Sequence, residues 1–265
     1  YKLSLAPFPV DYSFLHHDQE LYDLTHGIGK DGHFAPDYRI GLVLGWGGLR
    51  KKVADSLAAH AGDFEAAELL NAELEAIDGI RSWIHRTALA AEGRMRQMNL
   101  KLENDPPETL HEACQWIAWY NMASRTYNRD GAGGQLDEIL RPYYERDAAA
   151  GRIDDEEAVY CIACLLLNDP HYYQIGGPDR DGNDQTSRVS YLILEAAHVL
   201  KTPCNLTIRV HDRMDEGLFR RGVQILLEDR LGCPRFSGDN ALIGGFMRNG
   251  YPVELARSRI ALGCN

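Results

Sequence analysis

The chain has 265 residues, a net charge of −11 and a hydrophobic fraction of 45%. This length and composition suit one large globular domain or two small ones. The acidic balance, without any basic cluster, disfavours a nucleic-acid partner, because phosphates would be repelled. No stretch approaches the roughly 20 apolar residues of a membrane helix, so we expect no membrane partner.

The beginning of the chain and its cysteines indicate a compartment. The first residues (YKLSLAPFPV) lack the basic start and apolar stretch of a signal peptide, and they also lack an initiator Met, as an internal piece of a longer protein would. Six cysteines are scattered along the sequence, at a density far below that of small disulfide-stapled secreted domains. We therefore expect a reducing, cytoplasmic setting.

Cys161 and Cys164 form a C-x-x-C pair inside a segment that has the pattern of a helix. No second pair and no histidine pair accompanies them at zinc-finger spacing. The favoured interpretation is two buried helix cysteines, and we predict no metal site. A helical redox or metal protein that uses this pair remains the alternative.

The first third of the chain is expected to be helical after a loop-rich start. Residues 1–36 are rich in Pro and Gly, and residues 37–61 have a helical pattern that three glycines interrupt near Gly45. Residues 64–102 are rich in Ala, Glu, Leu and Arg, with apolar residues three and four positions apart. This periodicity predicts one long amphipathic helix.

The middle of the chain alternates helices with two long loops. Two prolines at 106–107 open a helix, since proline at a helix start loses no hydrogen bond. Glycine-rich residues 128–134 and residues 168–184 are expected to be loops. Asp154 is expected to cap the helix that follows it, with Glu157 in the capping-box position. A further helix is expected over residues 187–200.

Strand patterns enter in the last quarter. Residues 205–211 (NLTIRVH) alternate polar and apolar side chains, which predicts a strand. A helix over 215–231, a short strand at 235–237, helices from 240 and over 253–259, and a strand at 260–262 complete the expectation. Strands alternating with helices favour an α/β fold, and no linker suggests a domain boundary.

Several phrases, read together, resemble the glycyl radical enzymes, the superfamily of pyruvate formate-lyase and glycerol dehydratase. They occur in the family's order and at roughly its spacing over most of residues 27–265. The phrases are DPPETLHEA (105–113), GQLD with LRPYY (134–144), IGGPDRDGND with SYL and EA (175–196), NLTIRVH (205–211) and Gly263-Cys264.

The resemblance implies a fold and a mechanism. The fold is an α/β barrel of ten strands surrounded by helices, of which this chain would form part. A radical-SAM activating enzyme places a radical on a backbone glycine, which takes a hydrogen atom from the barrel's cysteine, and the resulting thiyl takes one from a small-molecule substrate. No cofactor is bound directly. The family is anaerobic and homodimeric.

The domain organisation follows from the same resemblance. Residues 1–265 would belong to a single pyruvate formate-lyase-like catalytic domain. The family's C-terminal phrase R-V-x-G-Y, which carries the glycyl radical, is absent from these residues. We therefore expect this chain alone to be inactive.

Cys264 is the predicted catalytic residue, as the cysteine that carries the thiyl. Gly263, rather than a second cysteine, precedes it, which disfavours pyruvate formate-lyase itself, and Asn265 replaces the family's usual Val. The alternative for Cys264 is an ordinary buried cysteine.

Five further residues are predicted to contact substrate. His33 could bind a substrate hydroxyl, or be a solvated loop histidine. Arg129 and Asp130 occupy the place of a His-Ser pair in the dehydratases. They could hold a carboxylate and a hydroxyl or ammonium group, or form a plain turn. His171 and Tyr172 could form an aromatic wall, or simply pack.

Asp137 belongs to one of the matched phrases but is given a different role. We expect it to tie its loop to neighbouring segments rather than to contact substrate.

The predicted function is a glycyl radical lyase of the dehydratase or decarboxylase type. It would cleave a C–O, C–C or C–N bond of a small polar substrate. The alternative is a non-catalytic paralogue that keeps the barrel fold and binds a ligand or a partner.

Overall fold

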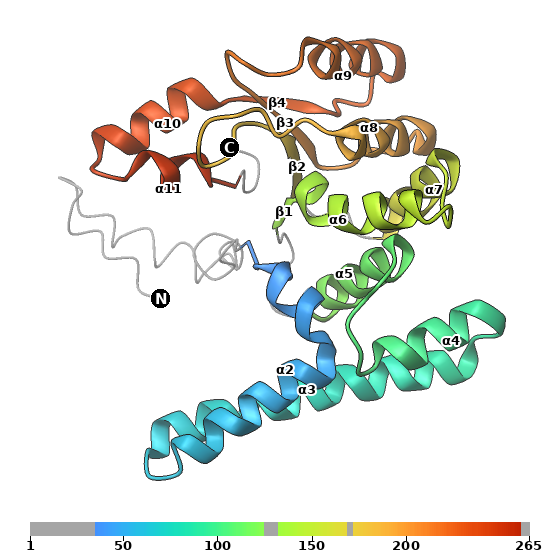
Figure 1. Cartoon of the computed structure of the whole chain (residues 1–265), viewed down its shortest axis with the longest axis vertical. Helices are drawn as coiled ribbons and strands as arrows, with labels where there is room; N and C mark the ends of the chain where they lie inside the picture. The colour runs from blue at the N-terminus through green and yellow to red at the C-terminus, as the bar shows by residue number, and fades with distance from the viewer. Residues whose placement is uncertain (1–34, 125–131, 169–171, 261–265) are drawn as a thin grey trace, which may run out of the picture.

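A computed structural model of the chain describes residues 35–124, 132–168 and 172–260. Four parallel strands, in the order β1-β2-β3-β4, form its single described sheet. The strands lie side by side in the middle of the molecule, with α6 to α9 on one side and α10 and α11 on the other (Figure 1). The helices α2 to α4 form an arm that extends away from this body (Figure 1).

The arm begins with α2 (Tyr38–Ala59), which bends at Gly45 as the interrupted pattern predicted. Gly45 has a φ of 63°, and a Cβ there would lie 2.5 Å from the backbone of Asp105. Only glycine tolerates both conditions. The bend therefore lets the loop around Asp105, which precedes the helix over Leu110–Ser124, pack directly against α2.

The prediction of one helix over 64–102 was wrong in one respect. The segment forms α3 (Phe64–Ala90) and α4 (Gly93–Leu102), and Ala91 between them is extended. Gly93 has a φ of 53°, which a right-handed helix cannot accommodate. Helical periodicity continues across the break because α4 packs back against α3 and buries apolar residues of its own.

The central helices are α5 (Leu110–Ser124), α6 (Leu136–Ala149) and α7 (Asp155–Asn168). The side chain of Asp154 accepts a hydrogen bond of 2.8 Å from the backbone N–H of Glu157, which confirms the predicted cap of α7. On α7, Cys161 is buried but Cys164 is exposed, so the expectation of two buried cysteines holds only for the first.

Two strands were missed in the segments expected to be loops. They are β1 (Ala132–Gln135) and β2 (Tyr172–Gly176). Two of the four residues of β1 are glycine and none is β-branched or aromatic, so it carries no strand signature of its own. β2 is buried at every position and shows no alternation, as strands of a parallel sheet covered on both faces do.

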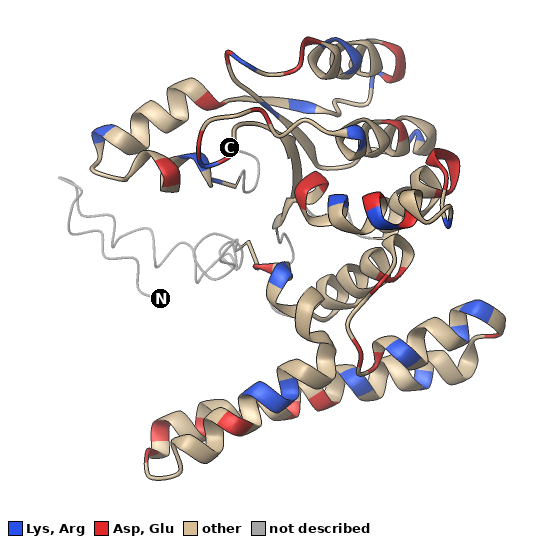
Figure 2. Cartoon of the chain, viewed as in Figure 1, with Lys and Arg blue, Asp and Glu red and all other residues tan. Residues whose placement is uncertain are grey.

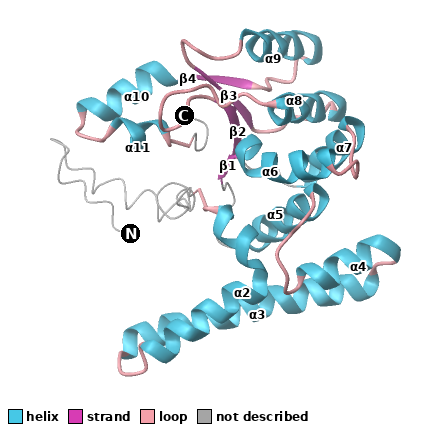
Figure 3. Cartoon of the chain, viewed as in Figure 1, coloured by secondary structure: helices cyan, strands magenta, loops and turns pink. Residues whose placement is uncertain are grey.

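The last part of the chain matches the predicted order of elements. It contains α8 (Arg188–Leu200), β3 (Leu206–Val210), α9 (Glu216–Asp229), β4 (Arg235–Gly238), α10 (Asp239–Arg248) and α11 (Val253–Arg257). Figure 3 shows helices connecting successive parallel strands, the arrangement that parallel pairing requires. The strand expected at 260–262 falls almost entirely outside the described residues.

The two faces of the sheet differ in chemistry because side chains alternate along each strand. Tyr173, Ile175 and Ile208 point into the apolar core shared with the helices. Their neighbours Gln174 and Arg209 belong to the opposite, polar face, and both are buried.

Charged residues are distributed over the whole of the described structure. Figure 2 shows acidic and basic residues interspersed along the helices, so the excess of negative charge is spread out. Among the described residues, no helix is both long and apolar enough to cross a membrane.

Candidate functional site

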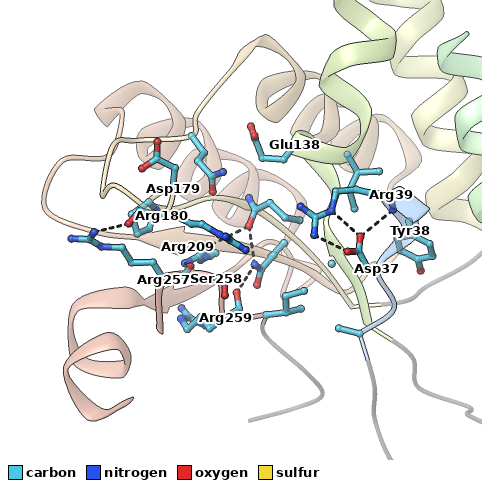
Figure 4. A pocket seen from close by; sticks show the side chains of 18 of the residues that line it. Asp37, Tyr38, Arg39, Glu138, Asp179, Arg180, Arg209, Arg257, Ser258 and Arg259 are labelled. Carbon is cyan, nitrogen blue, oxygen red and sulfur yellow. Dashed lines mark hydrogen bonds and ion pairs between the residues drawn. The ribbon is translucent and has the colours of Figure 1, made fainter. Parts of the chain in front are cut away.

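The candidate site is a pocket of about 350 Å³ at the carboxyl ends of the strands. Its wall comes from residues 35–39, the ends of β1 to β3, the loop after β2 and residues 257–260. Carboxyl ends of parallel strands are where α/β proteins generally place ligands. Figure 4 shows the polar side chains that converge there.

Arg209 of β3 lies at the centre of the polar face and is only 2% exposed. Its Nη2 donates to Asp239 Oδ2 at 2.7 Å and to the backbone carbonyl of Arg257 at 2.7 Å. Its Nη1 donates to Gln135 Oε1 at 3.2 Å. A guanidinium group can be buried at acceptable cost only when its N–H groups are hydrogen-bonded and its charge is paired in this way. Arg209 thereby joins the ends of β1, β3 and β4 to the last residue of α11.

Asp239, the first residue of α10, serves two cations at once. It is fully buried and also accepts a hydrogen bond from Arg259, which donates in addition to Ser237 Oγ at 3.0 Å. Burial lowers the pKa of the Arg259 guanidinium, with Arg209 adding to the effect and Asp239 opposing it. Two guanidinium groups therefore share one carboxylate beside the pocket.

Two glutamine side chains connect β1 and β2 across this face. Gln174 Nε2 donates to Gln135 Oε1 at 2.8 Å and to the backbone carbonyl of Arg259 at 3.0 Å. Gln135 Nε2 donates to the carbonyl of Gly176 at 2.7 Å. The backbone on both sides of Ser258 is thus held by side chains of the sheet, because Arg209 holds the carbonyl of Arg257.

Asp137 lies behind the pocket and ties three segments together. It is fully buried, and its Oδ2 accepts from the N–H of Gly176 at 2.7 Å and from Ser190 Oγ at 2.6 Å. Burial raises the pKa of this carboxyl, and these hydrogen bonds oppose the shift. The prediction that Asp137 anchors its loop rather than reaching a ligand is confirmed for its contacts within the chain.

A second link closes the loop after β2. His211 Nε2 and Asp184 Oδ1 are 3.1 Å apart, and Asp184 Oδ2 accepts from the N–H of Asp215 at 2.8 Å. Asp184 and His211 stand in two of the phrases that carry the resemblance. The phrases are distant in sequence and meet in space through these pairs.

Glu138 is the titratable group of the pocket that sequence reasoning missed. It lines the pocket on α6, where burial raises its pKa to about 7 even though Arg141 Nη2 donates to its Oε2 at 2.6 Å. A carboxyl that titrates near neutrality can give or accept a proton. Nothing in the local sequence signals this role, because the shift comes from tertiary burial.

The profile of a family described as pyruvate formate lyase-like matches residues 18–265. The chain belongs to this family. It is similar to isethionate sulfite-lyase of Desulfovibrio desulfuricans, with 24% identity over 274 residues that cover 86% of this chain and 33% of that protein.

Solved structures establish the fold. A structure from a study of 1,2-propanediol dehydration in Roseburia inulinivorans matches with a TM-score of 0.80 and 23% identity, covering 88% of this chain and 34% of that one. A glycyl radical enzyme from Archaeoglobus fulgidus matches with a TM-score of 0.73 and 21% identity, covering 87% and 35%. The four strands are thus part of a glycyl radical enzyme barrel, and the chain spans about one third of the length of its relatives.

Most of the predicted site residues of this family member lie outside the described residues. They are Cys264, His33, Arg129, Asp130 and His171. Tyr172 is described: it begins β2, is 7% exposed, and its ring lies 5.2 Å from the Arg235 guanidinium carbon. The described pocket wall includes Gln174, two residues further along β2, but not Tyr172. A substrate contact by Tyr172 stays a prediction.

Within residues 35–124, 132–168 and 172–260, no three His, Cys, Asp or Glu side chains are grouped to hold a metal ion. The polar groups that surround the pocket are instead suited to hydrogen bonding and to charge pairing.

Proposed function

We propose that this chain is the part of a glycyl radical lyase that carries the cysteine of the hydrogen-atom relay. The observation that carries the proposal is the anchoring of the segment that leads to Cys264. Side chains from the polar face of the sheet hold the backbone carbonyls of Arg257 and Arg259, and Ile260 lines the pocket. The chain enters the predicted cysteine loop only four residues later.

The proposed chemistry depends on where the Cys264 sulfur and the substrate are held, and less on the acidity of the thiol. In this family a glycyl radical supplies the oxidising equivalent by withdrawing a hydrogen atom from such a cysteine. Cys264 would then exchange hydrogen atoms with a carbon of the substrate, and a sulfur–hydrogen bond is close enough in strength for transfer in both directions. The ionisation of the thiol is therefore not the criterion. The protein must fix the substrate within reach and exclude water.

The described residues supply this positioning. Arg209 and Asp239 hold the strand ends rigid, and the two glutamines fix the entry to the cysteine loop. Glu138 on the pocket wall can hold or release a proton near neutral pH, as departure of a hydroxyl or amino group requires. Together they favour cleavage of a C–O, C–C or C–N bond in a small polar substrate.

We place the glycyl residue outside these 265 residues, since they contain no R-V-x-G-Y phrase. A radical-SAM activating enzyme, a homodimeric assembly and a cytoplasmic location are proposed on the family resemblance. His33, Arg129, Asp130, His171 and Tyr172 are the residues that we propose to contact substrate.

The decisive experiment uses the native protein that contains this chain, activated without oxygen by its activating enzyme. In Cys264→Ser, we expect the glycyl radical signal in electron paramagnetic resonance to persist, while turnover falls by at least about 1,000-fold. Cys164→Ser, which changes an exposed cysteine on α7, is the matched control and should alter neither readout. Full turnover in Cys264→Ser would overturn the proposal. Activation without turnover of any substrate would favour the non-catalytic alternative.

A further inference from the structure

Two cysteines lie close together at the amino ends of β3 and β4, on the side of the sheet away from the pocket. Cys204 lies two residues before β3, and Cys233 lies two residues before β4. The two strands are parallel neighbours, with Thr207 paired to Arg235, so the segments that lead into them run side by side. Their sulfur atoms are 3.1 Å apart.

This separation is that of two thiols in direct contact. A disulfide has a sulfur–sulfur distance of about 2.05 Å, so bond formation needs an approach of roughly 1 Å. The two cysteines stand at the ends of loop segments, outside the hydrogen-bonded ladder of β3 and β4, where such a shift breaks no strand pairing.

The two sulfurs are chemically unequal. Either thiol can donate in this contact. The hydrogen bond with Cys204 lowers the pKa of Cys233, with Arg235 contributing, while the pKa of Cys204 is raised. Cys233 is the better nucleophile near neutrality, and Cys204 is the adjacent thiol that can resolve an oxidised sulfur. Cys114 differs: burial holds the pKa of its thiol well above the ordinary value.

Access also favours the pair. Cys204 is half-buried, whereas Cys233 is only 7% exposed, so a small oxidant would approach the pair from the side of Cys204. The pair is separate from the candidate pocket, whose wall lies at the opposite ends of the same strands.

We propose that Cys204 and Cys233 form an oxidant-sensitive dithiol that a peroxide converts to an intrachain disulfide. The Cys233 thiolate attacks one peroxide oxygen and the O–O bond breaks, giving a sulfenic acid and hydroxide, which takes up a proton. The Cys204 sulfur then attacks the Cys233 sulfur, the S–S bond forms, the S–O bond breaks, and water leaves with the Cys204 proton. Two thiols lose two electrons in total, and hydrogen peroxide becomes two molecules of water.

The bond would fasten β3 to β4 at their amino ends. These strands carry Arg209 and lead into Asp239, so the modification acts on the wall of the candidate site without entering it. Closing the loop from 204 to 233 should raise the thermal midpoint of unfolding by about 5–10 °C.

The test uses the reduced full chain, treated with one equivalent of hydrogen peroxide under native conditions, alkylated and digested with trypsin. The expected product is a disulfide that joins the peptide TPCNLTIR (202–209) to LGCPR (231–235), with the loss of two hydrogen atoms and reversal by dithiothreitol. The rate of linkage should rise with pH, because the thiolate is the attacking species and the pKa of Cys233 is lowered.

Two variants make the result specific. Cys164→Ser should still give the linked peptides, whereas Cys204→Ser should leave Cys233 as a sulfenic or more oxidised acid. Circular dichroism of each variant, before oxidation, checks that the fold is retained. If the native chain gives no linked peptide, or gives pairings with the other cysteines in equal amounts, the proposal is overturned.

Discussion

Asp239 is the residue on which the candidate site depends most, because one carboxylate offsets two buried guanidinium groups. Arg209 and Asp239 have side chains that are 2% and 0% exposed, and the Arg259 side chain is 7% exposed. Water cannot compensate for a missing partner at this depth. The ion pairs of Asp239 with Arg209 and Arg259 therefore add little net stability. Their effect is to fix how the strand ends and the segment after α11 fit together.

We predict that Asp239→Asn destabilises the chain by about 3–5 kcal/mol, because it leaves two buried cations without a counter-charge. Urea unfolding followed by circular dichroism measures the change. Asp55→Asn, which breaks the exposed pair of Lys51 and Asp55, is the control and should cost less than about 1 kcal/mol. Similar losses for the two variants would show that the Asp239 cluster is not desolvated.

Glu138 gives a pH-dependent prediction at the same scale. Its pKa in the folded chain is about 7, above the ordinary 4.5, so the fold favours the neutral carboxyl. The associated stability is fully present below about pH 4.5 and is lost as the pH rises through 7. Glutamine resembles the neutral form, so Glu138→Gln should match the native chain at pH 4.5 and melt about 1–3 °C higher at pH 8.

Thermal unfolding at the two pH values tests this expectation. Glu216→Gln, at an exposed position on α9, is the matched control. If the native chain melted at a higher temperature than Glu138→Gln at pH 8, the ion pair with Arg141 would outweigh the cost of burying the Glu138 carboxylate.

At the scale of elements, close helix packing relies on glycine where an aromatic ring approaches the backbone. A Cβ on Gly41 of α2 would lie 2.1 Å from the Trp116 ring of α5. Gly79 on α3 has no atom within 4 Å of the same position. Both glycines lie inside helices, but only Gly41 is in contact with a neighbouring side chain. Gly79 is therefore a suitable control for a substitution at Gly41.

We predict that Gly41→Ala destabilises the chain by about 1–3 kcal/mol through overpacking. Gly79→Ala should stabilise it by about 0.5–1 kcal/mol, since alanine has the better helix propensity. Chemical denaturation of the two variants beside the native chain measures both signs. Stabilisation by both substitutions would mean that α2 and α5 can move apart at no cost.

At the scale of the whole molecule, the four described strands are part of a barrel, and the chain spans about one third of its relatives. Two of the phrases that resemble the family, those with Asp137 and Arg209, contribute to one polar face rather than to separate sites. The proposed site is therefore formed by residues at the ends of several strands, together with the predicted cysteine loop.

The native gene should reveal the remainder of that arrangement. On the proposed function, we predict that a glutamate codon follows Asn265, as the acid/base of the family's lyases, and that an R-V-x-G-Y phrase further downstream carries the glycyl radical. Sequencing of the natural transcript is the measurement. Continuation without either feature would favour the non-catalytic paralogue.

Sequence reasoning worked best where a local pattern alone specifies the structure. Amphipathic periodicity identified α3, the alternating phrase 205–211 identified β3, and the cap at Asp154 was predicted correctly. It failed for β1 and β2, because a glycine-rich strand and a fully buried strand have no period of their own. It also missed the break before α4.

By itself, the sequence determined the family, the α/β class and the anchoring role of Asp137, because those follow from ordered phrases and short-range patterns. Only the tertiary structure decided that Arg209 and Arg259 share Asp239, that Glu138 titrates near neutrality, and that Cys204 touches Cys233. Each of these depends on burial and on contacts between distant segments. Such contacts arise when parallel strands bring their ends together, and no local pattern encodes them.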